Sequence, residues 1–176
     1  MAWTTPRTWT DGEVVGQTIH NAHVRDNFNE TAVAKATAAG QIFVATGLNA
    51  LAARTPTEAT VATSQGTTST SYVDLATVGP TISTLTTGTQ AIVFLTAQIS
   101  NSGANSSFMG IDVSGATTVA AADTDALLVV GTSAVRATCI VFLTGLTPGT
   151  HTFTAKYRTT AGTATYVNRN VVVIPL

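Results

Sequence analysis

The sequence predicts an all-β protein whose C-terminal part is a jelly-roll β-sandwich. Three observations point to this class. From residue 67 onward, eight or nine strand-length segments alternate with turn signals such as Gly79-Pro80 and Thr147-Pro148-Gly149, a spacing typical of sandwiches. Apolar and polar residues alternate along residues 151–158, which indicates one buried and one wet face. Threonine, with about 36 residues, carries a β-branch that suits a pleated sheet.

The predicted strands of this C-terminal part, residues 67–176, follow one another with short turns between them. Two of them contain runs, residues 91–95 and 139–143, that are apolar on both faces. We expect these to be central strands, or strands covered on their second side by another subunit. In chain order the predicted strands are 72–77, 81–86, 89–100, 108–113, 117–122, 126–130, 135–144, 151–159 and 163–174.

The first 39 residues form a separate zone with a short helix. Trp3 and Trp9 flank Pro6 in a threonine-rich stretch that is unlike a helix, and a turn follows at 10–13. Residues 18–38 contain no Pro or Gly and are predicted to be helical, with Thr18 as the N-cap. Val24 and Phe28 lie at helical spacing on one seam. This seam is too short for an isolated coiled coil, so it needs a partner to cover it.

Residues 40–66 are predicted to be a β-hairpin followed by a linker. The strand 41–46 contains Phe43, Gly47-Leu48-Asn49 turns the chain, and 50–54 returns. A lone two-stranded hairpin is marginally stable in water, so this one is expected to pack against something else. The stretch 55–66, rich in Thr, Ala and Ser, is predicted to be an extended linker.

Composition excludes several functional classes. The net charge is −1 and only 10% of residues are charged, whereas binding to nucleic-acid phosphates usually requires a basic excess. No apolar run approaches the ~20 residues that span a bilayer, and the N-terminus lacks a signal-peptide pattern. Cys139 is the only cysteine, so it is expected to be a buried hydrophobe. We therefore predict no nucleic-acid partner and no membrane insertion, and folding in a reducing cytosol.

No catalytic constellation is present, so the prediction is a protein without enzymatic activity, cofactor or metal. His20 and His23 share a helix face, and they are either metal ligands around a trimer axis or polar residues at a subunit contact. His151 is interpreted as a structural histidine rather than a general base. The residues Asp112, Asp123 and Asp125 match no calcium-loop pattern and are interpreted as solvated turn residues.

Three stretches of the chain resemble virion proteins of tailed bacteriophages, particularly those of actinobacterial hosts. The opening, with Trp3, Trp9, Gly12-Glu13-Val14-Val15 and residues 21–27 (NAHVRDN), resembles the N-terminus of small structural proteins of such phages. Residues 40–51 (GQIFVATGLNAL) are similar to a hairpin unit of phage fibre proteins. Residues 146–153 (LTPGTHTF) through 168–176 (NRNVVVIPL) resemble trimeric jelly-roll heads on phage fibres and head-decorating proteins, which are related in shape to tumour-necrosis-factor-like domains.

The resemblance implies a homotrimer on the exterior of a virion, assembled in the host cytoplasm. Trp3 and Trp9 are then the virion anchor, and Val24, Phe28 and Phe43 are trimer contacts. The favoured function is a capsid decoration or head-fibre protein that contacts other virion proteins, such as the major capsid protein. The alternative is a tail-fibre or receptor-binding protein whose sandwich tip binds host-surface glycans through loops 101–106 and 123–125.

Overall fold

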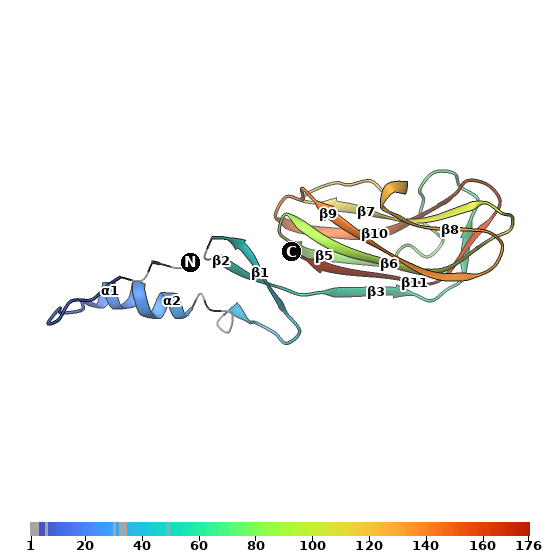
Figure 1. Cartoon of the computed structure of the whole chain (residues 1–176). Helices are drawn as coiled ribbons and strands as arrows, with labels where there is room; N and C mark the ends of the chain where they lie inside the picture. The colour runs from blue at the N-terminus through green and yellow to red at the C-terminus, as the bar shows by residue number, and fades with distance from the viewer. Residues whose placement is uncertain (1–3, 6, 30, 32–34, 49) are drawn as a thin grey trace. The chain divides into compact units, whose positions relative to one another are not determined.

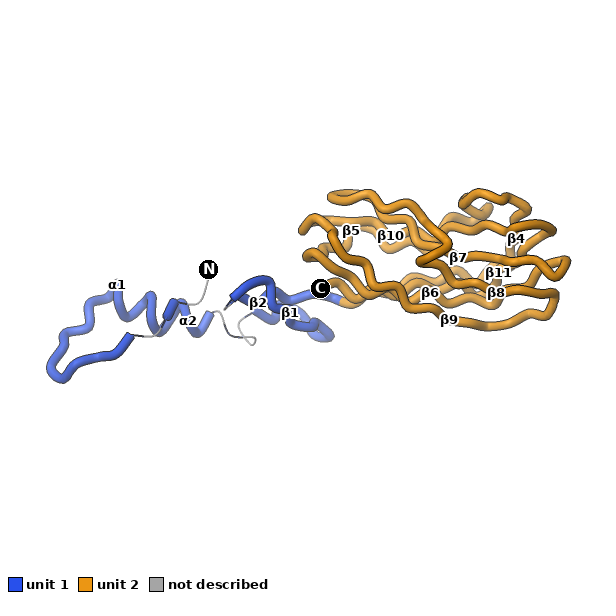
Figure 2. The backbone as a smooth tube through the Cα atoms, turned by 45° about the horizontal axis from the view of Figure 1, so that its top comes forward, with its two compact units in different colours: residues 1–55 blue, residues 56–176 orange. Residues whose placement is uncertain are grey.

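The chain forms two compact units, Met1–Thr55 and Pro56–Leu176, which Figure 2 colours separately. The computed structural model describes all residues except 1–3, 6, 30, 32–34 and 49. No helix among the described residues combines the length and apolarity needed to cross a membrane.

The first unit consists of a helical run and a hairpin. The helical run comprises α1 (Gln17–His20), the π-helical turn η1 (Asn21–Arg25) and α2 (Asp26–Phe28). The predicted helix was longer, but residues 36–38 are not helical. At the end of the run, the Thr31 hydroxyl donates to the Phe28 carbonyl at 2.9 Å, which offers that carbonyl an alternative to a helical bond. The predicted hairpin is present as antiparallel β1 (Ile42–Gly47) and β2 (Ala50–Arg54).

The second unit is an antiparallel β-sandwich of two sheets (Figure 1), as predicted. The four-stranded sheet has the order β5-β10-β7-β8, and the five-stranded sheet has the order β3-β11-β6-β9, with β4 also paired to β11. Successive strands mostly alternate between the two sheets, which is the jelly-roll arrangement. The bounds are β3 (Thr57–Val61), β4 (Gln65–Thr67), β5 (Thr81–Thr87), β6 (Gln90–Asn101), β7 (Ser106–Gly115), β8 (Ala126–Val130), β9 (Val135–Thr144), β10 (Gly149–Thr159) and β11 (Ala164–Pro175).

Three segments differ from the sequence prediction. The predicted linker 55–66 contributes most of β3 and β4, which pair with β11, because an extended Thr-rich stretch can join a sheet edge as readily as it can span domains. The predicted strands 72–77 and 117–122 are instead loops that each make one isolated bridge, Val73 to Tyr157 and Val119 to Val113. A short 3₁₀ turn, η2 (Asp123–Asp125), follows the second loop.

The hydrophobic core lies between the two sheets. Along β10, residues 151, 153, 155 and 157 are buried and the residues between them are not, as the period-two pattern predicted. Cys139 is only partly buried and packs against this core. Its thiol pKa is raised, chiefly by burial. The largest fully buried apolar side chains are Tyr157, Tyr166, Phe153, Leu95, Ile99, Met109, Val93, Val113, Val171 and Val173.

Candidate functional site

The outer face of the five-stranded sheet carries a continuous set of large apolar side chains. Register places Phe94 of β6 between Ile140 of β9 and Val172 of β11, and places Ile92 between Phe142 and Ile174 in the next row. Residues of this parity point away from the core, because their strand neighbours at 91, 93, 141, 143, 171 and 173 are buried. The apolar face therefore consists of Ile92, Phe94, Ile140, Phe142, Val172 and Ile174.

Two of the six residues of this apolar face are exposed to solvent in the single chain, and the other four are half-buried. Ile140 is 64% exposed and Phe142 is 55% exposed, and both belong to β9, which lies at the edge of the sheet. Edge strands are usually protected by charges, prolines or bulges, whereas the middle of this one is apolar on both sides. The sequence had indicated that run 139–143 needed either a central position or cover from another subunit. Because β9 is an edge strand, the central position expected for this run is wrong, and its cover by another subunit stays a prediction.

The other end of the same sheet face is polar. Thr96 and Thr138 are hydrogen-bonded through their hydroxyls at 2.8 Å, and beyond them lies a hollow of about 300 Å³. Glu58 accepts a hydrogen bond from the Asn170 amide at this hollow. The lining residues are Glu58, Thr60, Val61, Ala62, Arg136, Asn168, Arg169 and Asn170.

A bulge in β11 directs the side chain of Arg169, one of the residues that line the hollow, into the protein interior. The register shifts between Val167 and Asn170, and Asn168 takes a φ of +50°, a left-handed conformation in which Asn is enriched. The Arg169 side chain consequently enters the interior and is fully buried. Its guanidinium lies 5.3 Å from the Tyr157 ring.

Buried Arg169 acts as a clamp on the segment that precedes β5. Its Nη1 donates to the carbonyls of Thr77 and Gly79 at 3.3 and 3.2 Å, and its Nη2 donates to the Thr63 carbonyl at 3.5 Å and Gln65 Oε1 at 3.2 Å. A buried charge is costly unless hydrogen bonds compensate for its lost hydration. Four such bonds assign Arg169 a structural role.

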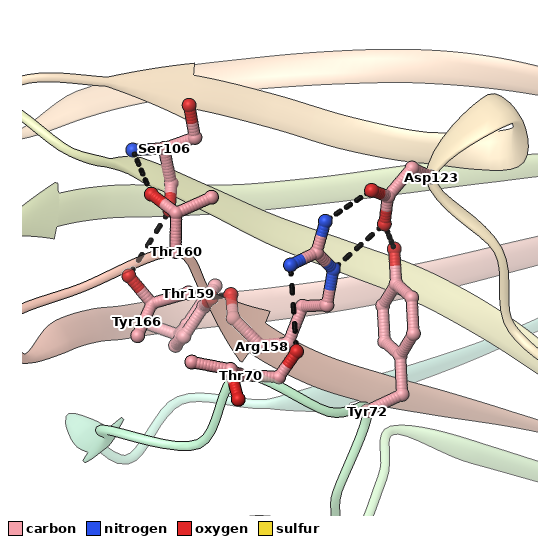
Figure 3. A network of polar contacts seen from close by, with 8 residues as sticks. All are labelled: Thr70, Tyr72, Ser106, Asp123, Arg158, Thr159, Thr160 and Tyr166. Atoms are coloured by element: carbon pink, nitrogen blue, oxygen red, sulfur yellow. Dashed lines mark hydrogen bonds and ion pairs between the residues drawn. The ribbon is translucent and has the colours of Figure 1, made fainter.

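The chain's own loops cover part of the outer face of the four-stranded sheet, whereas Leu128 and Val130 on its edge strand β8 stay 49% and 59% exposed. Tyr72 lies over Gly110, where a Cβ atom would come within 2.9 Å of its ring. The Tyr72 hydroxyl donates to Asp123 Oδ1 at 3.0 Å, and Arg158 Nε donates to the same oxygen at 2.7 Å. Figure 3 shows Arg158 between Tyr72, Asp123 and the Thr70 carbonyl. We call Tyr72, Asp123 and Arg158 the cover network.

The electrostatics of the cover network follow from these contacts. The hydrogen bond from Arg158 is the main cause that lowers the pKa of the Asp123 carboxyl. Burial, followed by the Asp123 carboxylate, raises the pKa of the Tyr72 hydroxyl. The Arg158 guanidinium also stacks 4.1 Å from the Phe108 ring. The network thus joins two loops to the sheet and is a structural device.

The first unit has almost no interior of its own. Among its described residues, Asn27 is the only buried one; it bonds the Thr4 backbone through both its amide oxygen and nitrogen. Trp9 contacts the His23 ring edge-on at 6.4 Å and lies 4.7 Å from the Arg7 guanidinium, yet stays 40% exposed. Trp3, the other predicted anchor, lies outside the described residues.

The predicted trimer contacts are on separate elements of the first unit. Phe28 ends α2 and is 70% exposed, and Phe43 of β1 is 39% exposed. Val24, in η1, is partly buried. These positions retain the exposed apolar surface that the sequence analysis expected. The six residues of the apolar face on the sandwich were not among the predicted site residues, although the two-sided apolar runs had signalled four of them.

Some of the candidate metal and acid–base residues make local contacts, although His23 Nδ1 and His151 Nε2 are buried without a hydrogen-bond partner. No group of three or more His, Cys, Asp or Glu suited to a metal occurs among the described residues. His151 is fully buried with Nδ1 3.1 Å from the Thr87 hydroxyl, consistent with the structural interpretation. Asp123 belongs to the cover network. His20 is exposed, whereas His23 packs on Trp9.

The loops proposed as a glycan site are braced from within. Asn101 is buried and donates to the hydroxyls of Ser107 and Thr159 at 3.0 and 2.9 Å, while its Oδ1 accepts from the Gly103 amide. The second loop, 123–125, is held by Arg158.

Comparison with known proteins gives little beyond the fold. No protein-family model matches the chain, and no curated protein matches its sequence. One similar solved structure is that of infectious bursal disease virus, Gx strain, at 12% identity and a TM-score of 0.42. The match covers 75% of this chain and 36% of the viral chain, so this chain spans about a third of that protein. Because this structural similarity is low, the fold class is assigned from the strand topology of the chain itself.

Proposed function

We propose that this chain is a non-enzymatic structural protein of a phage virion, displayed on the particle exterior as a homotrimer. The first unit attaches the chain to other virion proteins, and the sandwich projects outward. The observation that carries the proposal is the near-absence of an interior in the first unit: within its described residues only Asn27 is buried, while Phe28 and Phe43 are exposed. A hairpin and a short helix of this kind are marginal alone.

Two further features support the assignment to a virus particle. The N-terminal stretch, the hairpin segment and the C-terminal strands resemble phage virion proteins in sequence. The composition is close to neutral, with 10% charged residues, and a surface with few charges loses little hydration when many copies pack closely. Within this proposal Trp3 and Trp9 form the anchor, and Val24, Phe28 and Phe43 form trimer contacts.

The favoured position is on the capsid, as a decoration or head-fibre protein. The alternative is a tail fibre whose loops 101–106 and 123–125 bind host-surface glycans. Immuno-electron microscopy of particles that carry the chain distinguishes the two. Label spread over the shell supports decoration, and label confined to the tail supports the alternative. Particles without label would contradict both.

The anchor is tested by deleting residues 1–10 in the virus and measuring how much of the chain remains on purified particles. We expect loss of the chain from particles, with the sandwich still folded by circular dichroism. The double variant Phe28→Ser with Phe43→Ser is expected to weaken attachment as well. Val14→Ser is the matched control, because Val14 is 91% exposed and outside the proposed contacts. Full occupancy after the deletion would rule out the anchor.

A further inference from the structure

We propose that the hollow at the β11 bulge binds a small carboxylate that also carries hydroxyl groups, such as a sugar acid. The residues that line it belong neither to the apolar face nor to the loops 101–106 and 123–125, and the proposal goes beyond the proposed function. The hollow measures about 300 Å³, at the lower end of the range for small-molecule pockets. It therefore has room for one sugar-sized molecule.

The bulge places the irregular part of β11 at the hollow. The register of β11 against β6 shifts between Val167 and Asn170, and Asn168 has a φ of +50°. Bulges and left-handed residues other than glycine are over-represented at functional sites, where they redirect side chains. Because Asn168 and Asn170 both line the hollow, the irregular segment of the strand is also the one that a bound molecule contacts.

Two polar side chains of the hollow are free to bind a ligand. The side chains of Arg136 and Asn168 are exposed and have no hydrogen bond or ion pair with any residue that the structure describes. A guanidinium binds a carboxylate through two parallel hydrogen bonds. A side-chain amide can both donate to a hydroxyl and accept from it. The hollow thus contains a partner for each of the two chemical groups of the ligand.

The charges of the hollow narrow the class of ligand. Glu58 of β3 lines the same hollow and accepts a hydrogen bond from the Asn170 amide. A carboxylate that accepts one bond can accept more, so it offers sites to hydroxyl donors. An anion without donors meets the like charge of Glu58, and a simple cation meets the like charge of Arg136. A molecule with both a carboxylate and hydroxyl groups avoids both conflicts.

The site is tested by titrating the purified full-length chain with methyl β-glucuronide and following its backbone amide signals by NMR. We expect saturable shifts at residues 58–62, 136 and 168–170, with a dissociation constant in the millimolar range. Methyl β-glucoside, which lacks the carboxylate, and acetate, which lacks the hydroxyls, should each bind about fivefold more weakly. Equal binding of either compound, or no saturable shift at these residues, would overturn the proposal.

Two variants locate the binding. Arg136→Gln removes the charge, and Asn168→Gly removes the amide while glycine still adopts the left-handed backbone of the bulge. Each should weaken glucuronide binding about fivefold, and Arg136→Gln should also abolish the preference for glucuronide over glucoside. Arg25→Gln, which removes an exposed guanidinium from the first unit, is the matched control and should bind like the parent. The amide spectra report whether each variant is folded, and undiminished binding by both folded variants would contradict the site.

Gluconate separates the two sources of this ligand chemistry. Tighter binding of the ring-closed glucuronide indicates a sugar-acid residue of a polysaccharide, whereas tighter binding of open-chain gluconate indicates a free hydroxy acid. Either result upholds the proposed class of ligand. None of these measurements involves particle attachment, so failure of this site leaves the proposed function standing, and failure of the anchor leaves this site standing.

Discussion

The two outer faces of the sandwich differ in how far the chain's own loops cover their side chains. Around Gly110 and Phe108 the four-stranded sheet is shielded by loops of the same chain, which Tyr72, Asp123 and Arg158 fasten to it. The five-stranded sheet presents Ile140, Phe142 and their neighbours to solvent. Polar bonds thus accumulate where loops of the chain cover a sheet, whereas the apolar side chains of Ile140 and Phe142 stay exposed on the outer face of the other sheet. The predictions below probe this difference through folding stability, from the largest expected effect to the smallest.

Removing the buried guanidinium of Arg169 should lower the free energy of unfolding the most. Arg169 holds the segment 63–79, which carries Tyr72, so Arg169→Met removes four hydrogen bonds at once. The Gly79 carbonyl and Gln65 Oε1 keep their second donors, Tyr157 and Thr77. We expect the free energy of unfolding to fall by about 3 kcal/mol, measured by urea denaturation. Arg136→Met, at an exposed position of the same sheet, is the control and should change stability by less than about 0.5 kcal/mol. Equal effects from both would show that burial of Arg169 carries no special weight.

Displacing the loops that lie over Gly110 should have the next largest effect on the free energy of unfolding. A Cβ atom at position 110 would lie 2.9 Å from the Tyr72 ring and 3.1 Å from the Ala121 side chain, so the loops must shift to admit Gly110→Val. Overpacking of this kind costs about 2 kcal/mol, and urea denaturation is again the measurement. Thr138→Ile on the uncovered face adds less bulk than Gly110→Val, with open space above it, and gives up the hydroxyl bond to Thr96. If it proved as destabilising as Gly110→Val, the contrast between the faces would fail.

Acid should loosen the cover network by a smaller amount. The pKa of Asp123 is lower in the folded chain than its unfolded value of about 3.9, so its contribution to stability is complete above that value and is lost as the pH falls through the folded pKa. Because Asp123 is largely solvent-exposed, the contribution should be no more than about 1 kcal/mol. Asp123→Asn should therefore be less stable than the parent at neutral pH and equal to it at strongly acid pH. A difference that persists in acid would assign the effect to packing.

Changes on the uncovered face should barely affect the stability of a single chain. Ile140→Thr removes apolar surface that the isolated chain does not bury, so unfolding at the lowest workable concentration should shift by less than about 0.5 kcal/mol. A loss above about 1 kcal/mol in dilute protein would mean that Ile140 is already packed within the chain.

Local sequence patterns predicted the sandwich and its inner faces well. The period-two alternation at 151–158 identified the buried side of β10, and the two-sided apolar runs identified strands that need cover on both faces. What these patterns did not contain is pairing between distant segments. The edge position of β9 depends on its pairing with β6 alone, and the entry of 57–61 into the sheet depends on β11, so neither follows from local periodicity.

Arg169 shows a different limit on what can be predicted from local sequence. Arg169 stands between two asparagines in a strand, where a charged residue is expected to face solvent. The bulge at Asn168 inserts an extra residue and reverses the side on which the following residues lie, which brings Arg169 inside. The flanking Asn168 was the available signal, since asparagine tolerates the left-handed backbone that the bulge uses.

The position of β11 has a consequence for biosynthesis. This strand pairs with β3, β4 and β6, yet it is synthesised after all three of them. Until it emerges, β3 and β4 lack their sheet partner and the apolar β6 and β9 are exposed as an incomplete pair. The sandwich therefore folds after its strands are translated, with long-range pairings that form slowly. Species with exposed apolar surface and unpaired strand edges are prone to aggregate, so expression at low temperature should improve the soluble yield.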